Sequence, residues 1–110
     1  MVNGKQKGKR GELELAKKLN EHGFTTRRSV QYNGKADDGK ADLLGLPGIH
    51  IECKRVERLH IEAAMFQAIQ DAKGGEFPTV FHRKNGGGWL VTMRLDDWVE
   101  LYKKFKEAEL

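Results

Sequence analysis

Three charged side chains in the middle of the sequence have the types and spacing to act on one substrate. Glu52 and Lys54 lie in the segment 49–54, in which apolar and polar residues alternate, so a strand would place both side chains on one face. Asp42 lies in a second short apolar segment, and the dipeptide Pro47-Gly48 between the two segments is typical of a turn. A hairpin would bring the carboxylates of Asp42 and Glu52 together, with the Lys54 ammonium beside them.

These three side chains favour a metal site that hydrolyses phosphodiesters. The carboxylate oxygens of Asp42 and Glu52 suit Mg²⁺ or Mn²⁺ and suit zinc poorly. Such an ion can polarise a phosphate and lower the pKa of a water, which Lys54 can hold or deprotonate. The alternative is a surface pair of Glu52 and Lys54, worth roughly a few tenths of a kcal/mol. His50 shares this face and is interpreted as a bystander.

A helix expected from Lys9 to about His22 adds a third acid. Leu15, Ala16 and Leu19 form its apolar stripe, and Glu12 falls in the middle of that stripe. A carboxylate in this position needs a metal ion, a lysine or an arginine nearby. The alternative is that Glu12 only complements the positive end of the helix dipole.

The next two segments supply basic side chains. Residues 24–31 have the composition of a strand, which would point Arg27 and Arg28 to opposite faces, so one arginine should face the acids. Residues 32–40 have the composition of a flexible loop. The pair Asp37-Asp38 in this loop is interpreted as turn-forming rather than metal-binding.

A second helix and a second hairpin follow. The segment 61–73 is helical by its apolar spacing and is ended by Gly74-Gly75. Gln67 lies at the edge of the apolar stripe, where its amide could reach a phosphate or a water at the metal. A solvent-facing glutamine is the alternative. The segments 79–83 and 89–94 flank an Asn-Gly turn and predict the hairpin.

The last segment, from Leu95 to about Glu109, predicts a third helix with Asp96 or Asp97 as its N-cap. Its apolar stripe is wide for so small a chain and comprises Leu95, Trp98, Val99, Leu101, Tyr102 and Phe105. We interpret this stripe as ordinary core, with part of it in a subunit interface as the alternative.

Composition sets the broad class. A chain of 110 residues suits one domain, here residues 9–110 after a flexible basic arm at residues 1–8. The net charge of +4 and the pI near 9.3 favour a polyanionic partner. The single cysteine argues against disulfides and favours a reducing cytoplasm. No apolar run is long enough for a membrane span, and the N-terminus lacks the features of a signal peptide.

The order of the expected elements predicts an α+β fold, with a central mixed β-sheet flanked by α-helices. Basic residues of the arm and the loop should meet phosphates, so binding to a polyanion should weaken steeply with salt. The residues concerned are Lys9, Arg10, Lys35 and Lys40.

Four short motifs carry a resemblance to a known family. They are Gly11-Glu12-Leu13-Glu14-Leu15 continuing to His22-Gly23-Phe24, then Arg28-Ser29, Ala41-Asp42-Leu43-Leu44-Gly45 and Ile51-Glu52-Cys53-Lys54. With these motifs the chain resembles the PD-(D/E)xK nuclease superfamily, and specifically the archaeal-type Holliday junction resolvases, including related phage and prophage proteins. The second half of the chain matches in outline only, as a helix followed by a hairpin.

The resemblance implies a restriction-endonuclease-like fold and a Mg²⁺-dependent DNA endonuclease with Glu12, Asp42, Glu52 and Lys54 as catalytic residues. It also implies that the backbone carbonyl of Cys53 ligates metal, that Arg28 contacts the site or DNA, and that Ser29 contacts DNA. The implied assembly is a homodimer with two active sites, each nicking one strand of a four-way junction to leave a 5′-phosphate.

The chain departs from the family pattern at three places. Leu13 stands where the archaeal proteins often have a basic residue, and Ala41 stands where the motif's name places proline. The long closing helix from Asp96 is not part of the minimal archaeal pattern.

Overall fold

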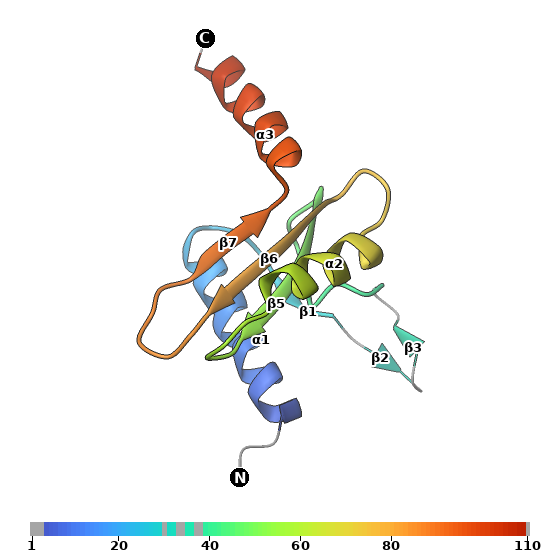
Figure 1. Ribbon diagram of the computed structural model, residues 1–110, viewed down its shortest axis with the longest axis vertical. Helices are drawn as coiled ribbons and strands as arrows, with labels where there is room; N and C mark the ends of the chain where they lie inside the picture. The colour runs from blue at the N-terminus through green and yellow to red at the C-terminus, as the bar shows by residue number, and fades with distance from the viewer. Residues whose placement is uncertain (1–3, 30, 33–34, 37–38, 110) are drawn as a thin grey trace.

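The computed structural model describes residues 4–29, 31–32, 35–36 and 39–109, with side chains for residues 8–29 and 39–109. The helices are α1 (Gly4–Glu21), α2 (Ile61–Asp71) and α3 (Leu95–Ala108). The strands are β1 (Arg27–Arg28), β2 (Gln31–Tyr32), β3 (Lys35–Ala36), β4 (Leu43–Leu44), β5 (Ile49–Arg55), β6 (Phe77–Arg83) and β7 (Leu90–Met93) (Figure 1). Among the described helices, none has the length and apolar character needed to cross a membrane.

The main sheet is mixed and has the strand order β1-β4-β5-β6-β7. β5 and β6 are parallel and are connected by α2, whereas β1, β4 and β7 pair antiparallel with their neighbours. β2 and β3 form a separate antiparallel pair. The predicted α+β fold with a mixed sheet flanked by helices is therefore confirmed.

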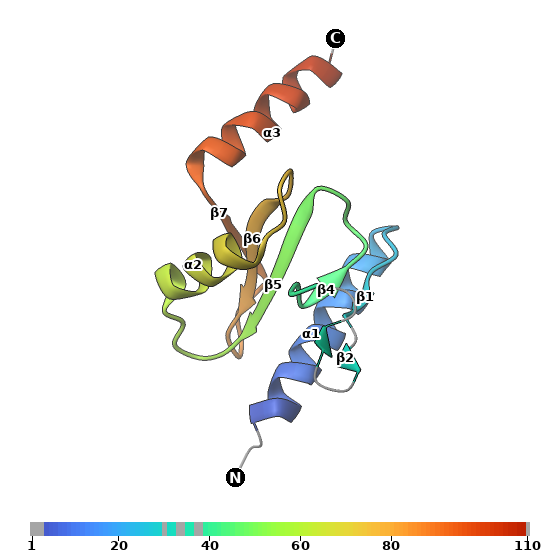
Figure 2. The same cartoon turned by 90° about the vertical axis from the view of Figure 1, so that its right-hand side faces the viewer.

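Helices cover both faces of this sheet (Figure 2). On the side of α1, buried apolar residues from α1, β4, β5 and β6 form the main core: Leu15, Ala16, Leu43, Ile51, Cys53 and Phe81. On the side of α2, Ala64 and Ala68 pack against Val80. β5 is consequently buried on both of its faces, including the face that carries His50 and Glu52.

α1 approaches β5 closely at Gly11. A Cβ atom at this position would lie 2.6 Å from the Cβ of Arg55, so glycine is required for the contact. Glu14 contacts Arg83 of β6, and its Oε2 lies 3.6 Å from Arg55 Nε. This cluster of charges ties α1 to two strands.

The first helix begins earlier than the sequence indicates. Residues 4–8, predicted as part of a flexible arm, belong to α1. The residues Lys5, Gln6, Lys7 and Lys9 are good helix formers, which explains the extension. Of the predicted arm, residues 1–3 lie outside the described part of the chain.

The predicted strand at 24–31 is much shorter in the structure. Only Arg27–Arg28 pairs with the main sheet, while the predicted loop at 32–40 contributes to the β2–β3 pair. The pair Asp37-Asp38 lies outside the described residues.

Both predicted hairpins are present in the structure. The last helix has the predicted extent, but it does not pack as predicted. α2 ends at Asp71, two residues before its predicted end. The N-cap of α3 is Arg94 and not an aspartate, and no side chain caps the helix. Asp97, in the first turn, accepts a hydrogen bond from Arg94 Nε at 2.9 Å. Asp97 is also the one buried residue of α3 within its described range, so the prediction that its apolar stripe is core is wrong.

Two alanine substitutions in α1 test the close approach at Gly11. Gly11→Ala should lower the free energy of unfolding by about 1 kcal/mol or more, because the added methyl overpacks against Arg55. Gly8→Ala has nothing within 4 Å and should raise it by up to about 1 kcal/mol, as expected from helix propensity alone. Urea unfolding of both variants measures the difference. Equal stabilisation by both would contradict the proposed contact.

Candidate functional site

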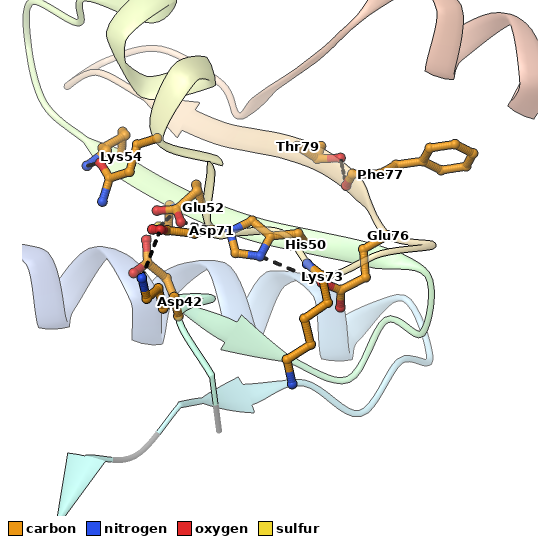
Figure 3. A network of polar contacts seen from close by, with 12 residues as sticks. Asp42, His50, Glu52, Lys54, Asp71, Lys73, Glu76, Phe77 and Thr79 are labelled. Carbon is orange, nitrogen blue, oxygen red and sulfur yellow. Dashed lines mark hydrogen bonds and ion pairs between the residues drawn. The ribbon is translucent and has the colours of Figure 1, made fainter. Parts of the chain in front are cut away.

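Asp42 is fixed by its backbone and by its side chain. Its amide donates to the carbonyl of Ile51 at 2.8 Å, and its carbonyl accepts from the amide of Ser29 at 3.1 Å. The amide of Cys53 donates to Asp42 Oδ2 at 2.8 Å. The carboxylate is therefore held at the junction of β4 and β5, as the predicted hairpin requires (Figure 3).

Glu52 comes from the middle of β5 and is only 1% exposed. Its Oε1 lies 2.8 Å from Nε2 of His50, a histidine that is equally buried. The other ring nitrogen of His50 lies 3.9 Å from Oε1 of Glu76, which also accepts a hydrogen bond from the amide of Lys73 at 2.8 Å (Figure 3). His50, interpreted from the sequence as a bystander, contacts the buried Glu52 through its ring, and whether it has a role in function stays untested.

Burial and like charges make the proton affinity of Asp42 unusually high. Desolvation, which is the largest cause, and the negative charges of Glu52 and Glu12 together raise the pKa of this carboxyl from 3.8 to about 7. The hydrogen bond from the Cys53 amide opposes this shift only in part. The contributions of Glu52 and Glu12 to this pKa indicate that both carboxylates lie within electrostatic reach of Asp42.

Glu12 is turned toward an arginine. Arg28 Nε donates to Glu12 Oε1 at 2.7 Å, and both side chains are partly buried. The cation that the sequence requires beside Glu12 is thus Arg28. Glu12 still raises the pKa of Asp42, so its carboxylate lies near the site. Among the described residues, its carboxylate is hydrogen-bonded to Arg28 and not to Asp42 or Glu52.

Lys54 lies one pleat beyond Glu52 on the same strand. Its Nζ donates to Oε1 of Gln67 on α2 at 3.4 Å, which draws the ammonium toward the exposed edge of that helix. Gln67, predicted at the edge of the apolar stripe of α2, therefore contacts the site through Lys54.

The thiol of Cys53 lies in the core beneath α1, on the face of β5 opposite to Glu52. Burial, together with the charges of Asp42 and Glu12, raises its pKa to about 12, so the thiol stays protonated at neutral pH. A role of its backbone carbonyl in metal binding stays a prediction.

The basic residues predicted to meet DNA are spread over several elements. Lys9 and Arg10 are exposed on α1, and Lys40 is exposed with its Nζ 3.9 Å from Asp71 Oδ1. Ser29 is partly buried and joins β1 to Asp42 through its amide. The side chain of Lys35 lies outside the described part of the chain.

The donor set fits a hard divalent ion with few protein ligands. In the described ranges, no group of three or more His, Cys, Asp or Glu residues is arranged to hold a metal ion. Mg²⁺ is commonly bound by one or two carboxylates, with water and substrate oxygens completing its coordination. Asp42 and Glu52 can supply two such oxygen ligands, and their crowded negative charge would favour a cation between them.

The sequence missed two partners of these residues. His50 carries a recognisable signal, since it stands two residues before Glu52 and a strand places both on one face. Glu76 carries no such signal. It lies just before β6, and it comes close to His50 only because β6 returns parallel to β5 after the connection through α2. The pairing of Glu14 with Arg83 is equally remote in sequence.

Comparison with known proteins adds no family to this geometry. No protein-family model matches the sequence, and a search of curated proteins found no match.

The raised pKa of Asp42 predicts a pH-dependent stability. Between about pH 4 and pH 7 the folded protein keeps a proton that the unfolded chain has lost, so the free energy of unfolding of the metal-free protein should fall as the pH rises. Asp42→Asn should remove this decrease, and Asp96→Asn, at an exposed position, should retain it. Thermal unfolding across this pH range measures the difference. Parallel curves for wild type and Asp42→Asn would contradict it.

The contact between His50 and Glu52 predicts a second stability difference. His50→Leu leaves the buried Glu52 oxygen without its partner, while His50→Gln keeps a donor of similar size. The leucine variant should be less stable than the glutamine variant by about 1–3 kcal/mol in urea unfolding. The same two substitutions at His82, a less buried histidine bonded to Thr92 at 2.8 Å, should differ by less. An equal difference at both histidines would argue against a special role for His50.

Proposed function

We propose that this protein is a Mg²⁺-dependent, structure-selective DNA endonuclease of the PD-(D/E)xK superfamily with a restriction-endonuclease-like fold. Within that superfamily we propose a Holliday junction resolvase that acts as a homodimer in a reducing cytoplasm. The observation that carries the proposal is the crowding of Asp42 and Glu52 at the β4–β5 hairpin, with Lys54 on the same strand.

Each residue of the site has a chemical task in this proposal. Mg²⁺, or Mn²⁺ in its place, would polarise the scissile phosphate and make water a better nucleophile. Asp42 and Glu52 would hold the ion, and Lys54 would position the attacking water and steady negative charge on the phosphate. Gln67 would set the direction of the Lys54 side chain, with which it shares a hydrogen bond.

The charges around Glu12 serve the same end. Arg28 neutralises the charge of Glu12. Its other guanidinium N–H groups would donate hydrogen bonds to a phosphate at the site. Glu12 would complete the metal shell through water rather than directly, because its Oε1 is bonded to Arg28. Ser29, Lys9, Arg10, Lys35 and Lys40 would contact the DNA backbone, and the net charge of +4 supports this partner.

Two other functions make different predictions. The same nuclease site could act on flaps, strand ends or linear duplex rather than on four-way junctions. A DNA-binding module without catalysis is the other candidate, but it gains nothing from carboxylates that face phosphate. Cleavage of a labelled junction, flap and duplex of matched sequence, with Mg²⁺ or with chelator, separates the three. Preference for the junction supports the resolvase, and tight binding without any cleavage supports the module.

Conservative substitutions of the acids test the site directly. Asp42→Asn and Glu52→Gln should each slow junction cleavage by about 100-fold or more, because each removes a charged ligand of the ion. Binding to the junction in the absence of metal should be retained or improve, since a negative charge facing phosphate is lost. Glu21→Gln, at an exposed position of α1, serves as the matched control and should cleave at the normal rate. Normal cleavage by either acid variant would show that the site is assigned wrongly.

A further inference from the structure

α3 projects away from the sheet (Figures 1 and 2). Most of its large apolar side chains are exposed to solvent. Trp98, Tyr102 and Phe105 are 50%, 46% and 58% exposed, and Leu95 is more exposed still. The rings form a continuous row, with centroids 5.3 Å apart between Trp98 and Tyr102 and 6.0 Å apart between Tyr102 and Phe105. Contiguous aromatic surface of this kind marks an interaction site.

The length of α3 points the same way. A helix of 14 residues is marginal in water without tertiary packing, which usually supplies most of the stability of a helix. α3 buries only Asp97 among its described residues, and that side chain is held locally by Arg94. The helix therefore needs a partner against which its apolar stripe can pack.

The spacing of the stripe fits another helix. Leu95, Trp98, Tyr102 and Phe105 follow one another at intervals of three, four and three residues, which is the apolar pattern of helices that pair side by side. Val99 and Leu101 flank this seam and widen it. A partner helix with the same pattern would fill the spaces between these side chains.

The charges of α3 identify that partner and its direction. The first half of α3, residues 95–101, has the exposed acids Asp96 and Glu100 and no basic residue, whereas the second half, residues 102–108, has three lysines and one acid. A second α3 running antiparallel would set the acidic half of each helix beside the basic half of the other. A parallel arrangement would place like charges together, and it would also align the two helix dipoles unfavourably.

We propose that two copies of this chain associate through an antiparallel pair of α3 helices, related by a two-fold axis near residue 100. Leu95 of one copy then packs against Phe105 of the other, and Trp98 packs against Tyr102. Such a contact is self-complementary, as two-fold interfaces are. The pairing would join two nuclease sites in one assembly, and this consequence alone depends on the proposed function.

Sedimentation equilibrium over a range of concentrations tests the pairing. Wild type should be a dimer, and Trp98→Glu should raise the dissociation constant at least about 30-fold, the loss that corresponds to roughly 2 kcal/mol for a central aromatic residue. Glu107→Ala, outside the apolar stripe on the same helix, is the matched control and should dimerise normally. Circular dichroism checks that the rest of the fold is kept. A wild-type protein that stays monomeric at its highest soluble concentration would overturn the proposal.

Charge reversal identifies the partner as a second copy. Asp96→Lys/Glu100→Lys makes both halves of α3 basic, and Lys103→Glu/Lys104→Glu makes both halves acidic. Each double variant alone should dimerise more weakly than wild type, and an equimolar mixture should recover heterodimers. If the mixture forms no more dimer than either double variant alone, the charges do not determine the pairing and the proposal fails.

Cross-linking determines the direction of the helices. Leu95→Cys mixed with Phe105→Cys should form disulfide-linked heterodimers, whereas Leu95→Cys alone should not form homodimers through this position. The buried Cys53 leaves the wild type as an unlinked control. Cross-linking of Leu95→Cys to itself would show a parallel pair and refute the arrangement.

These experiments are independent of cleavage. A dimer that cuts no DNA would leave the α3 pairing intact and overturn the nuclease. A monomer that cuts DNA would overturn the pairing and the proposed homodimer, and it would leave the nuclease intact.

Discussion

Burial of carboxyl groups at the centre of the sheet is the constraint on which the rest of the structure depends. Glu52 has almost no exposed surface. Burial, together with the charge of the nearby Glu52, raises the pKa of Asp42 to about 7. Such groups are costly unless they are hydrogen-bonded or matched by a cation. The imidazole of His50 and the Cys53 amide, both in β5, meet this requirement for Glu52 and Asp42, and Arg28 meets it for Glu12.

The same constraint explains the arrangement of the helices. α2 must cover the polar face of β5 to bury His50 and Glu52, and its small residues Ala64 and Ala68 allow that approach. α1 must come close on the opposite side to bring Glu12 within electrostatic reach, which a glycine at position 11 allows. The ion pair of Glu14 with Arg83 then holds α1 against the strands.

Local patterns predicted those parts of the site that depend on local geometry. The two-residue period of β5 and the Pro47-Gly48 turn were enough to place Asp42, Glu52 and Lys54 together. The contact between His50 and Glu76 was missed because it spans the crossover between parallel strands. The exposure of α3 was missed for a different reason: an amphipathic stripe predicts that a helix buries one face, but it does not say against which chain.

The place of β5 in the sheet also decides how different parts of the molecule open. β5 is hydrogen-bonded to β4 on one edge and to β6 on the other, and both of its faces are covered. Its amides should therefore exchange with solvent only when the whole protein unfolds, whereas those of α3 exchange through local opening. The carboxyl pair thus keeps its geometry through fluctuations that detach the last helix. The acids of β5 and the exposed stripe of α3 belong to separate cooperative units of the chain.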